Sequence, residues 1–164
     1  MTIPTKQQCL EILKSSNVPD NIISHLKTVC DFSMKVVDSL EKRGVRVNRD
    51  LVAAAALLHD IKKVQSSEHE IEGAKFVKQL GFPEVAEVIR KHGLSNLDKQ
   101  GLVPKTWEEK IVFYSDKRVQ SSKIVSVDER FGYIKQRYKR EDVEKEMNFT
   151  KKVEKELLGN GGTD

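Results

Sequence analysis

The chain of 164 residues is 38% hydrophobic and 33% charged, a balance that excludes a disordered chain and indicates one folded domain. Its 29 basic and 25 acidic residues leave a net charge of +4, too small for the dense basic surface of a protein that binds a nucleic-acid polymer. No apolar run approaches the roughly 18 residues of a membrane span, and residues 1–7 lack the layout of a secretory signal. A cytoplasmic location without a membrane partner is therefore expected.

Apolar residues recur at spacings of three and four along most of the chain, and no long segment alternates with a period of two. This pattern predicts a single all-α domain over residues 1–159, built from about seven or eight helices, and a disordered tail at residues 160–164. In chain order, the expected helices cover 5–16, 19–44, 48–60, 68–80 and 83–93, followed by a loop over 94–105, helices that open at 106 and 126, and a final helix over 140–158.

These boundaries depend on residues that commonly begin or end helices. Asn48 can accept a backbone hydrogen bond as an N-cap, and Pro19 suits the first turn of a helix. Thr106 and Glu109 have the spacing of a capping box, in which each side chain bonds the backbone amide of the other residue. Residues 126–129 repeat that spacing, so two of the later helices have well-defined starts.

The four histidines of the chain each lie on the apolar side of a different expected helix. Their apolar neighbours stand three or four positions away, a spacing at which helical residues share one face. One aspartate of the sixth helix follows apolar residues in the same way. These polar residues, all expected to point inward, are His25, His59, His69, His92 and Asp116.

Any one of these side chains has an ordinary explanation. A lone histidine on an apolar face is more often a hydrogen-bonded core residue than a ligand, and Asp116 alone could be a salt-bridged carboxylate. The ordinary explanation does not fit the whole set. Asp60 adjoins His59, so two carboxylates would be buried among imidazoles, which is costly without a cation. Imidazole nitrogen with carboxylate oxygen suits Fe, Mn, Zn, Ni or Co and disfavours calcium, so one or two divalent transition-metal ions are expected.

The order of these residues resembles that of the HD-domain metal-dependent phosphohydrolases. The motif of that family is a histidine, a later His-Asp pair and a distant aspartate, which here are His25, His59-Asp60 and Asp116. The resemblance covers residues 25–119 and is most specific around the His-Asp pair. It implies a helical bundle in which these four residues hold one metal ion.

Two further histidines, His69 and His92, fall between the His-Asp pair and the final aspartate. This order resembles the branch of the family with a two-metal centre, as in the diadenosine-tetraphosphate hydrolases. It implies a second ion held by His69 and His92, with Asp60 bridging the two ions. The cyclic-dinucleotide phosphodiesterases are disfavoured, because the second signature of that branch is absent from the sequence.

The activity implied by the resemblance is hydrolysis of a phosphate ester or anhydride by metal-activated water. The substrate would be a small molecule such as a dinucleoside polyphosphate or a nucleoside monophosphate. Asp60 would take part in catalysis, and Lys63 would add positive charge where the phosphoryl oxygens gather. Lys62, Lys117 and Arg118 are weaker candidates for substrate contacts, and solvated side chains explain Lys62 and Arg118 equally well.

Lys62 also departs from the family, because many members have glycine at its position. It would either reshape the turn or add a phosphate contact. The loop over 94–105 could cover the pocket, with a tryptophan just after it as a stacking surface, and three residues of the later helices could reach a substrate, although core packing or a solvated face explains them as well. These residues are Trp107, Tyr133, Arg137 and Arg140.

Two other functions are consistent with the same helical pocket. A domain that only binds or senses nucleotides would need a broken ligand set, whereas every residue of the motif is present here. A di-iron centre would support oxygenase chemistry, as in some proteins with the HD fold. Association of two copies into a homodimer is left open.

Overall fold

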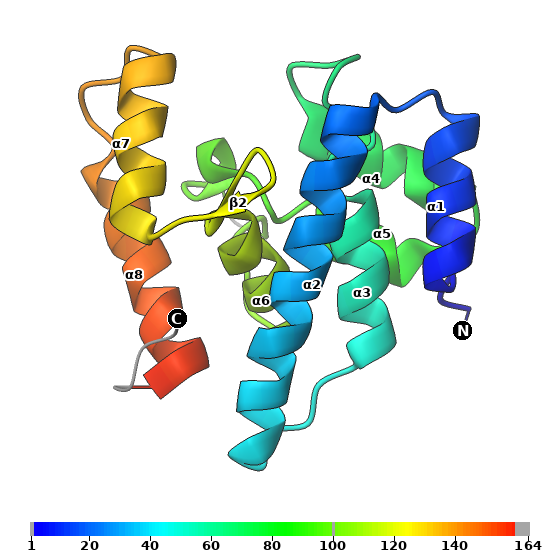
Figure 1. Cartoon of the computed structure of the whole chain (residues 1–164), viewed down its shortest axis with the longest axis horizontal. Coiled ribbons are helices and arrows are strands. Elements are labelled where there is room, and N and C mark those ends of the chain that lie inside the picture. Colours follow the sequence, from blue (N-terminus) through cyan, green and yellow to red (C-terminus); the bar gives the residue numbers. More distant parts are fainter. Residues whose placement is uncertain (1, 100, 160–164) are drawn as a thin grey trace.

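Eight α-helices make up most of the computed structural model, which describes residues 2–99 and 101–159 (Figure 1). The all-α prediction is therefore confirmed, while the predicted tail at 160–164 lies outside the described residues. None of these helices combines the length and the apolarity that crossing a membrane requires. The helices are α1 (Lys6–Ser15), α2 (Asp20–Lys42), α3 (Arg49–Leu58), α4 (His69–Gln79), α5 (Pro83–Ile89), α6 (Trp107–Asp116), α7 (Val127–Arg137) and α8 (Glu144–Leu158), with a 3-10 turn at Leu94–Asn96.

The predicted signals act at several helix ends. Thr106 and Glu109 form the reciprocal capping box of α6, and Asn48 caps α3 through its side chain. Ser126 caps α7 by accepting a backbone amide hydrogen bond. Gly44 follows α2 with φ +83°, a left-handed conformation that glycine adopts without strain. Local sequence therefore accounts for these boundaries.

Two helix ends differ from the predicted positions. α5 ends at Ile89 rather than near residue 93, because the chain then continues in tighter turns, in which the His92 amide bonds the Ile89 carbonyl at 3.2 Å. α8 begins at Glu144 rather than at residue 140, because Lys139 has φ +50° and interrupts the helical path after α7. Apolar spacing alone does not reveal either change of backbone conformation.

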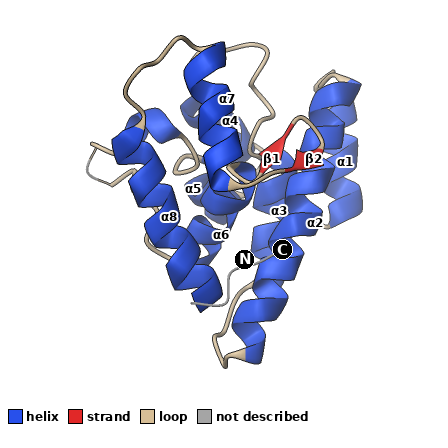
Figure 2. Cartoon of the chain, turned by 60° about the vertical axis from the view of Figure 1, so that its left-hand side comes forward, coloured by secondary structure: helices blue, strands red, loops and turns tan. Residues whose placement is uncertain are grey.

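A small hairpin was not predicted from the sequence. Strands β1 (Val119–Gln120) and β2 (Lys123–Ile124) pair antiparallel after α6 and contact α2 (Figure 2). Ser121, in the turn between them, has φ +56°. Strands of two residues are too short to show a period of two in the sequence, which is why the hairpin was missed.

Helix α3 lies at the centre of the domain and packs against α1, α2, α5 and α6. Every residue from Val52 to Leu58 is buried, and those at 53–56 are all alanine. Small side chains let the neighbouring helices approach closely on several sides. α2 and α3 run side by side in opposite directions (Figure 1), so the C-terminal end of α3 reaches the N-terminal half of α2. The residues that follow α3 are thereby placed inside the domain.

Helices α7 and α8 lie together at one side of the molecule, on the left of Figure 1. α8 packs against α2 and α6, and α7 packs against α8. α7 buries Val127, Phe131 and Ile134 and leaves most of its other residues accessible. This accessible part of α7 borders the cavities described below.

Replacing Ala55 with leucine should lower the free energy of unfolding by about 1–3 kcal/mol, because the larger side chain cannot fit a fully buried site without displacing its neighbours. Urea denaturation followed by circular dichroism measures this change. Val64→Leu is the control, since Val64 is 68% exposed, and it should alter stability by less than about 0.5 kcal/mol. Equal stability of Ala55→Leu and the unmodified protein would contradict the tight packing of α3.

Candidate metal centre

Three helices end near one point inside the domain. α3 ends just before His59 and Asp60, α6 ends at Asp116, and His92 lies shortly beyond the end of α5. His25 reaches the same point from α2. The C-terminal end of a helix carries partial negative charge, so the convergence of three such ends favours a cation there.

The first group of polar atoms gathers around Asp116. Its Oδ1 atom lies 3.0 Å from His25 Nε2 and 3.3 Å from His59 Nε2. Asp60 Oδ2 lies 3.7 Å and 3.6 Å from the same two nitrogens. All four residues are buried, and one atom from each lies within 4.8 Å of the others. Metal–ligand bonds of about 2.0–2.2 Å place ligand atoms at separations of this size.

The second group shares Asp60. Its Oδ1 atom lies 3.2 Å from His69 Nε2 and 3.4 Å from His92 Nε2. Asp60 therefore directs one carboxylate oxygen to each group, Oδ2 toward His25 and His59, and Oδ1 toward His69 and His92. A carboxylate placed in this way can bridge two metal ions.

The other ring nitrogen of three histidines is held away from the centre by a hydrogen bond. The Nδ1 atoms of His59 and His92 donate to backbone carbonyls three residues earlier, at 2.8 and 2.6 Å. His25 Nδ1 donates to the carbonyl of Ser121 at 2.7 Å. A carbonyl cannot donate, so each Nδ1 carries a proton and Nε2 faces the carboxylates. That is the orientation in which histidine binds a metal.

His92 Nε2 is the clearest sign that these residues fit an ion. It is completely buried and has no hydrogen-bond partner among the described residues, which is unusual for a buried nitrogen. Burial holds the pKa of His92 below its ordinary value, so the ring is neutral and able to bind a cation. With the two carboxylates, the donor set is one of imidazole nitrogen and oxygen. The buried cluster is therefore compatible with a divalent metal site.

Comparison with known families agrees with this geometry. A family model described as HD domain matches residues 22–120, more than half of the chain. The chain belongs to the HD-domain family. The matched segment contains every histidine and aspartate of the centre. The resemblance identified in the sequence is thus confirmed, and it places the domain in a superfamily of metal-dependent phosphohydrolases.

None of three curated proteins that resemble this chain is named as a phosphohydrolase. A tRNA (cytidine(56)-2'-O)-methyltransferase of Picrophilus torridus is 32% identical over 99% of this chain and 49% of its own length. A protein of the same name from Thermoplasma volcanium is 33% identical, over 75% of this chain and 40% of its own length. An uncharacterized protein of Methanocaldococcus jannaschii is 30% identical, over 75% of this chain and 80% of its own length. The chain thus spans half or less of the two methyltransferases, and no solved structure matches it.

Both aspartates of the centre, Asp60 and Asp116, are held in their ionised form. Burial by itself raises the pKa of each carboxyl, but neighbouring positive groups outweigh it and keep both pKa values well below the ordinary range. For Asp60 the strongest opposing influence is His59, and for Asp116 it is Lys117 followed by His59. An ionised carboxylate is the form that binds a metal.

Two lysines adjoin these carboxylates in different ways. Lys117 is buried and donates to Asp116 Oδ2 at 2.6 Å and to the His92 carbonyl at 3.1 Å, which leaves Asp116 Oδ1 facing the centre. Lys63 Nζ lies 3.2 Å from Asp60 Oδ2, and its side chain is 38% exposed at the edge of a cavity. Burial lowers the pKa of Lys63, but Asp60 and Asp116 outweigh it, so the net shift is upward and the ammonium group stays charged.

The centre opens into a cavity of about 530 Å³. Leu94 and Ser95, from the predicted loop at 94–105, line one part of it. Arg130 and Tyr138 line another part, from the side of α7. A cavity of this size accommodates a small molecule, with its polar groups directed at the histidines and aspartates.

Arg118, a weaker candidate for substrate contact, does not line this cavity. It is buried, and its Nε and Nη1 atoms donate to the Val125 carbonyl and the Tyr114 hydroxyl, each at 2.6 Å. Tyr114 in turn donates to Glu154 on α8. Arg118 is therefore neither solvated nor directed at a substrate, and it joins α6, the end of the hairpin and α8.

Lys62 and Trp107 also lie away from the cavity. The Lys62 ammonium donates to Gln65 at 3.0 Å and lies 4.3 Å from the centre of the Phe76 ring. Its backbone is not in the left-handed region, so the turn after the His-Asp pair does not require the glycine found in many family members. Trp107 packs against the hydrophobic core.

Three residues beside the centre were not among the candidates predicted from the sequence. Glu70 is buried, and its carboxylate lies 3.4 Å from His69 Nδ1. A Cβ atom at Gly93 would come within 2.9 Å of Glu70 Oε1, so the absence of a side chain there makes room for this carboxylate. Arg130 and Tyr138 line the cavity from positions about two helical turns apart. Two features of the sequence could have indicated these residues. Glu70 directly follows the candidate ligand His69, and Arg130 and Tyr138 are spaced so as to lie on one side of a helix.

Arg118→Ala should lower the free energy of unfolding by about 2–4 kcal/mol, because it leaves a buried hydroxyl, a carbonyl and a carboxylate without their cationic partner. Urea denaturation measures the loss, and elemental analysis of the purified variant should find the metal content of the unmodified protein. Arg46→Ala, which removes an exposed arginine, serves as the control for loss of charge. Reduced metal content at unchanged stability would contradict the structural role of Arg118.

Proposed function

We propose that this HD domain hydrolyses a phosphate ester or anhydride of a nucleotide, in a reaction that depends on a divalent transition metal. The main support is the placement of Asp60, whose two carboxylate oxygens lie 3.2–3.7 Å from the Nε2 atoms of four histidines in two groups. Membership in a superfamily of metal-dependent phosphohydrolases supports the same reaction class. The adjoining cavity supplies space for a small substrate.

The proposed ligands divide between two ions of Fe, Mn, Zn, Ni or Co. When bound, such ions supply a nucleophilic water at neutral pH and offset negative charge on phosphoryl oxygens. One ion would be held by the group around Asp116, and the other by the group around His69 and His92. Asp60 belongs to both groups. The two sets are His25, His59, Asp60 and Asp116, and Asp60, His69 and His92.

The remaining groups of the site bind and orient. Lys63 keeps a charged ammonium at the edge of the cavity, where it can bind a phosphoryl oxygen and stabilise the charge that develops during hydrolysis. Lys117 holds Asp116 in position from the buried side. The Nδ1 hydrogen bonds fix the histidine rings, so little reorganisation is needed when substrate binds.

The methyltransferase name of two relatives does not define the chemistry proposed here. This chain matches 49% and 40% of those proteins, so more than half of each lies outside the match. The name describes each relative as a whole and does not say which part carries methyl transfer. A nucleotide substrate is consistent with a domain that occurs within proteins named for tRNA modification.

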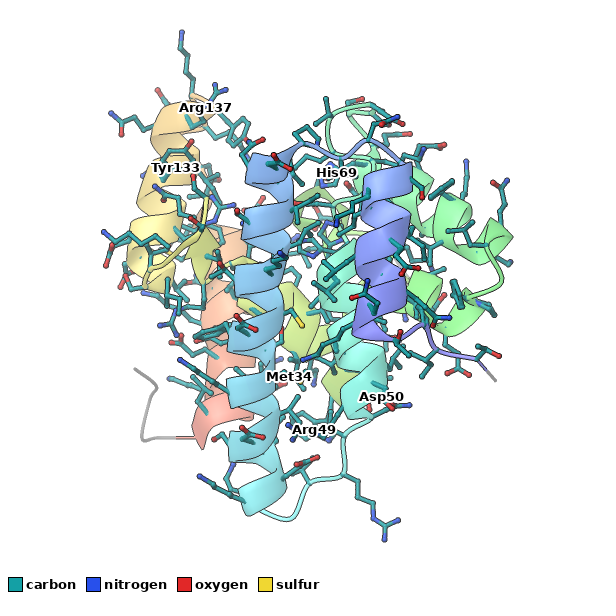
Figure 3. The ribbon with its side chains drawn as sticks, turned by 45° about the vertical axis from the view of Figure 1, so that its right-hand side comes forward. Met34, Arg49, Asp50, His69, Tyr133 and Arg137 are labelled. Atoms are coloured by element: carbon teal, nitrogen blue, oxygen red, sulfur yellow. The ribbon has the colours of Figure 1, made fainter. Side chains whose placement is uncertain are left out.

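Asp60→Asn should remove bound metal and reduce phosphate release by more than about 100-fold, because the amide keeps the shape of the side chain but loses the charge shared by both ligand groups. Elemental analysis and a phosphate-release assay on a panel of nucleotides, with manganese or cobalt added, measure the two effects. Asp50→Asn is the matched control, since Asp50 is exposed at the opposite end of α3 (Figure 3), and it should keep both metal and activity.

Turnover by metal-stripped Asp60→Asn would refute the mechanism. If the unmodified protein showed a raised melting temperature with nucleotides and no phosphate release, it would be a binding module. If it consumed oxygen, the centre would have redox chemistry.

His69→Ala and His92→Ala should each reduce the metal content from two ions to one per chain, because they remove ligands from only the second group. His25→Ala serves as the comparison, because it removes a ligand of the first ion instead of the second. Elemental analysis of the three variants against the unmodified protein gives the stoichiometry. A single ion in the unmodified protein, retained in both His69→Ala and His92→Ala, would contradict the two-ion centre and leave these histidines to orient substrate.

A further inference from the structure

A second cavity, of about 360 Å³, lies beside the metal centre between the N-terminal end of α2 and α7. Asn21 and Ile22 line it from α2, and Tyr133 and Arg137 line it from α7. Figure 3 shows the two labelled α7 residues on the part of the helix that lies next to the start of α2. The cavity is large enough to hold a part of a small ligand.

The two cavities adjoin each other. Lys63, Arg130 and Tyr138 line both of them. His25, a residue of the candidate metal centre, also borders the second cavity. A ligand whose reacting phosphate lies at the metal centre can therefore extend past these shared side chains into the second cavity.

The walls of the second cavity combine positive charge with aromatic rings. Three of its lining residues are cations, namely Lys63, Arg130 and Arg137. Tyr133 and Tyr138 provide two rings, and no carboxylate is among the described residues that line it. In a chain with 25 acidic residues, a wall with charge of one sign selects for an anionic ligand.

Neither guanidinium group of this wall pairs with a carboxylate of the described residues. Arg130 Nε is buried without a hydrogen-bond partner among the described residues. Arg130 instead lies 5.9 Å from the ring centre of Tyr133. Arg137 lies 5.7 Å from that of Tyr138. Neither arginine forms an ion pair within the described chain, whereas nearby Arg140 pairs with a carboxylate of α8 at 2.6 Å. Stacking on a ring restrains a guanidinium and leaves its donors available for phosphate.

α7 lies outside the segment that matches the family. The match ends at residue 120, and α7 spans Val127–Arg137. The candidate metal ligands all belong to the matched segment, whereas most of the cationic and aromatic wall does not. Most of the wall therefore lies outside the segment that matches the family model.

We propose that α7 forms a second binding subsite, which holds the distal phosphate and the nucleoside of the substrate. Arg130 and Arg137 bind the phosphate through charge-assisted hydrogen bonds, and Tyr133 and Tyr138 offer surfaces on which a base stacks. The inference deepens the proposed function and rests on it for the position of the reacting phosphate. A nucleoside with two or more phosphates in series is then preferred over a nucleoside monophosphate.

Binding of non-reacting ligands tests this subsite. α,β-Methylene-ADP, in which a carbon bridge resists hydrolysis, and AMP are titrated separately into the metal-loaded protein by calorimetry. The analogue should bind about tenfold more tightly than AMP, the gain expected from one charge-assisted hydrogen-bond contact. Arg137→Ala and Arg130→Ala should each remove most of this difference, and Tyr133→Ala should weaken the binding of both ligands, because it removes a ring on which the base stacks.

Lys135→Ala is the matched control, because it removes one positive charge from the same helix at an exposed position that lines neither cavity. It should bind the analogue as the unmodified protein does. Circular dichroism of all variants establishes that they are folded. Equal affinity of Arg137→Ala, Arg130→Ala and Lys135→Ala for the analogue would overturn the proposal, as would equal binding of AMP and the analogue by the unmodified protein.

Calorimetry also separates this inference from the proposed function, because it measures binding whether or not phosphate is released. A nucleoside phosphate can come from a free nucleotide or from the end of an RNA strand. A 5′-phosphorylated RNA trinucleotide is therefore titrated in parallel. Tighter binding of the RNA than of the analogue, lost in Arg137→Ala, identifies an RNA end as the source. Weaker binding of the RNA identifies a free nucleotide.

Discussion

Burial of two carboxylates is the constraint on which the rest of this structure depends. Asp60 is 2% exposed and Asp116 is 7% exposed, and two ionised groups so close together inside a protein are costly unless positive charge surrounds them. Lys117 supplies one buried charge, and Lys63 supplies another at the edge of the cavity. The imidazoles then complete a shell whose Nε2 atoms face the carboxylates, an arrangement that a divalent cation can stabilise further.

The secondary structure contributes to the same electrostatic balance. The last carbonyls of a helix have no partner within the helix, and their partial negative charge adds to that of the carboxylates. At the ends of α3 and α5, His59 and His92 use their Nδ1 protons to satisfy such carbonyls while Nε2 faces the centre. One side chain thus terminates a helix and presents a metal-binding nitrogen, which explains why these histidines stand where the helices end. The buried alanines of α3 bring one of these ends into the interior.

The parts of the structure that sequence predicts well are those with a local physical cause. Apolar spacing identified the helices, capping residues identified several of their starts, and the placement of histidines on apolar faces predicted that they would converge. The hairpin and the early end of α5 depend instead on short turns that apolar spacing does not reveal, and the position of Arg118 depends on the hairpin and on α8. Arg118 illustrates this limit, because its partner Val125 becomes a neighbour only when the hairpin forms, and its ion-pair partner Glu154 lies on α8.

The metal centre and the wall of the second cavity come from different parts of the chain, and this separation has a physical consequence. The candidate ligands must keep separations of a few ångströms among themselves, so they lie on, or just after, helices that pack against one another. Residues that select a substrate need only face the cavity, and α7, packed against α8, can present different side chains there without disturbing the ligands. Substitutions in α7 could thus alter which phosphate substrate binds while the candidate metal ligands stay the same. In the proposed subsite, Arg130, Arg137 and the two tyrosines beside them would therefore determine which substrate binds.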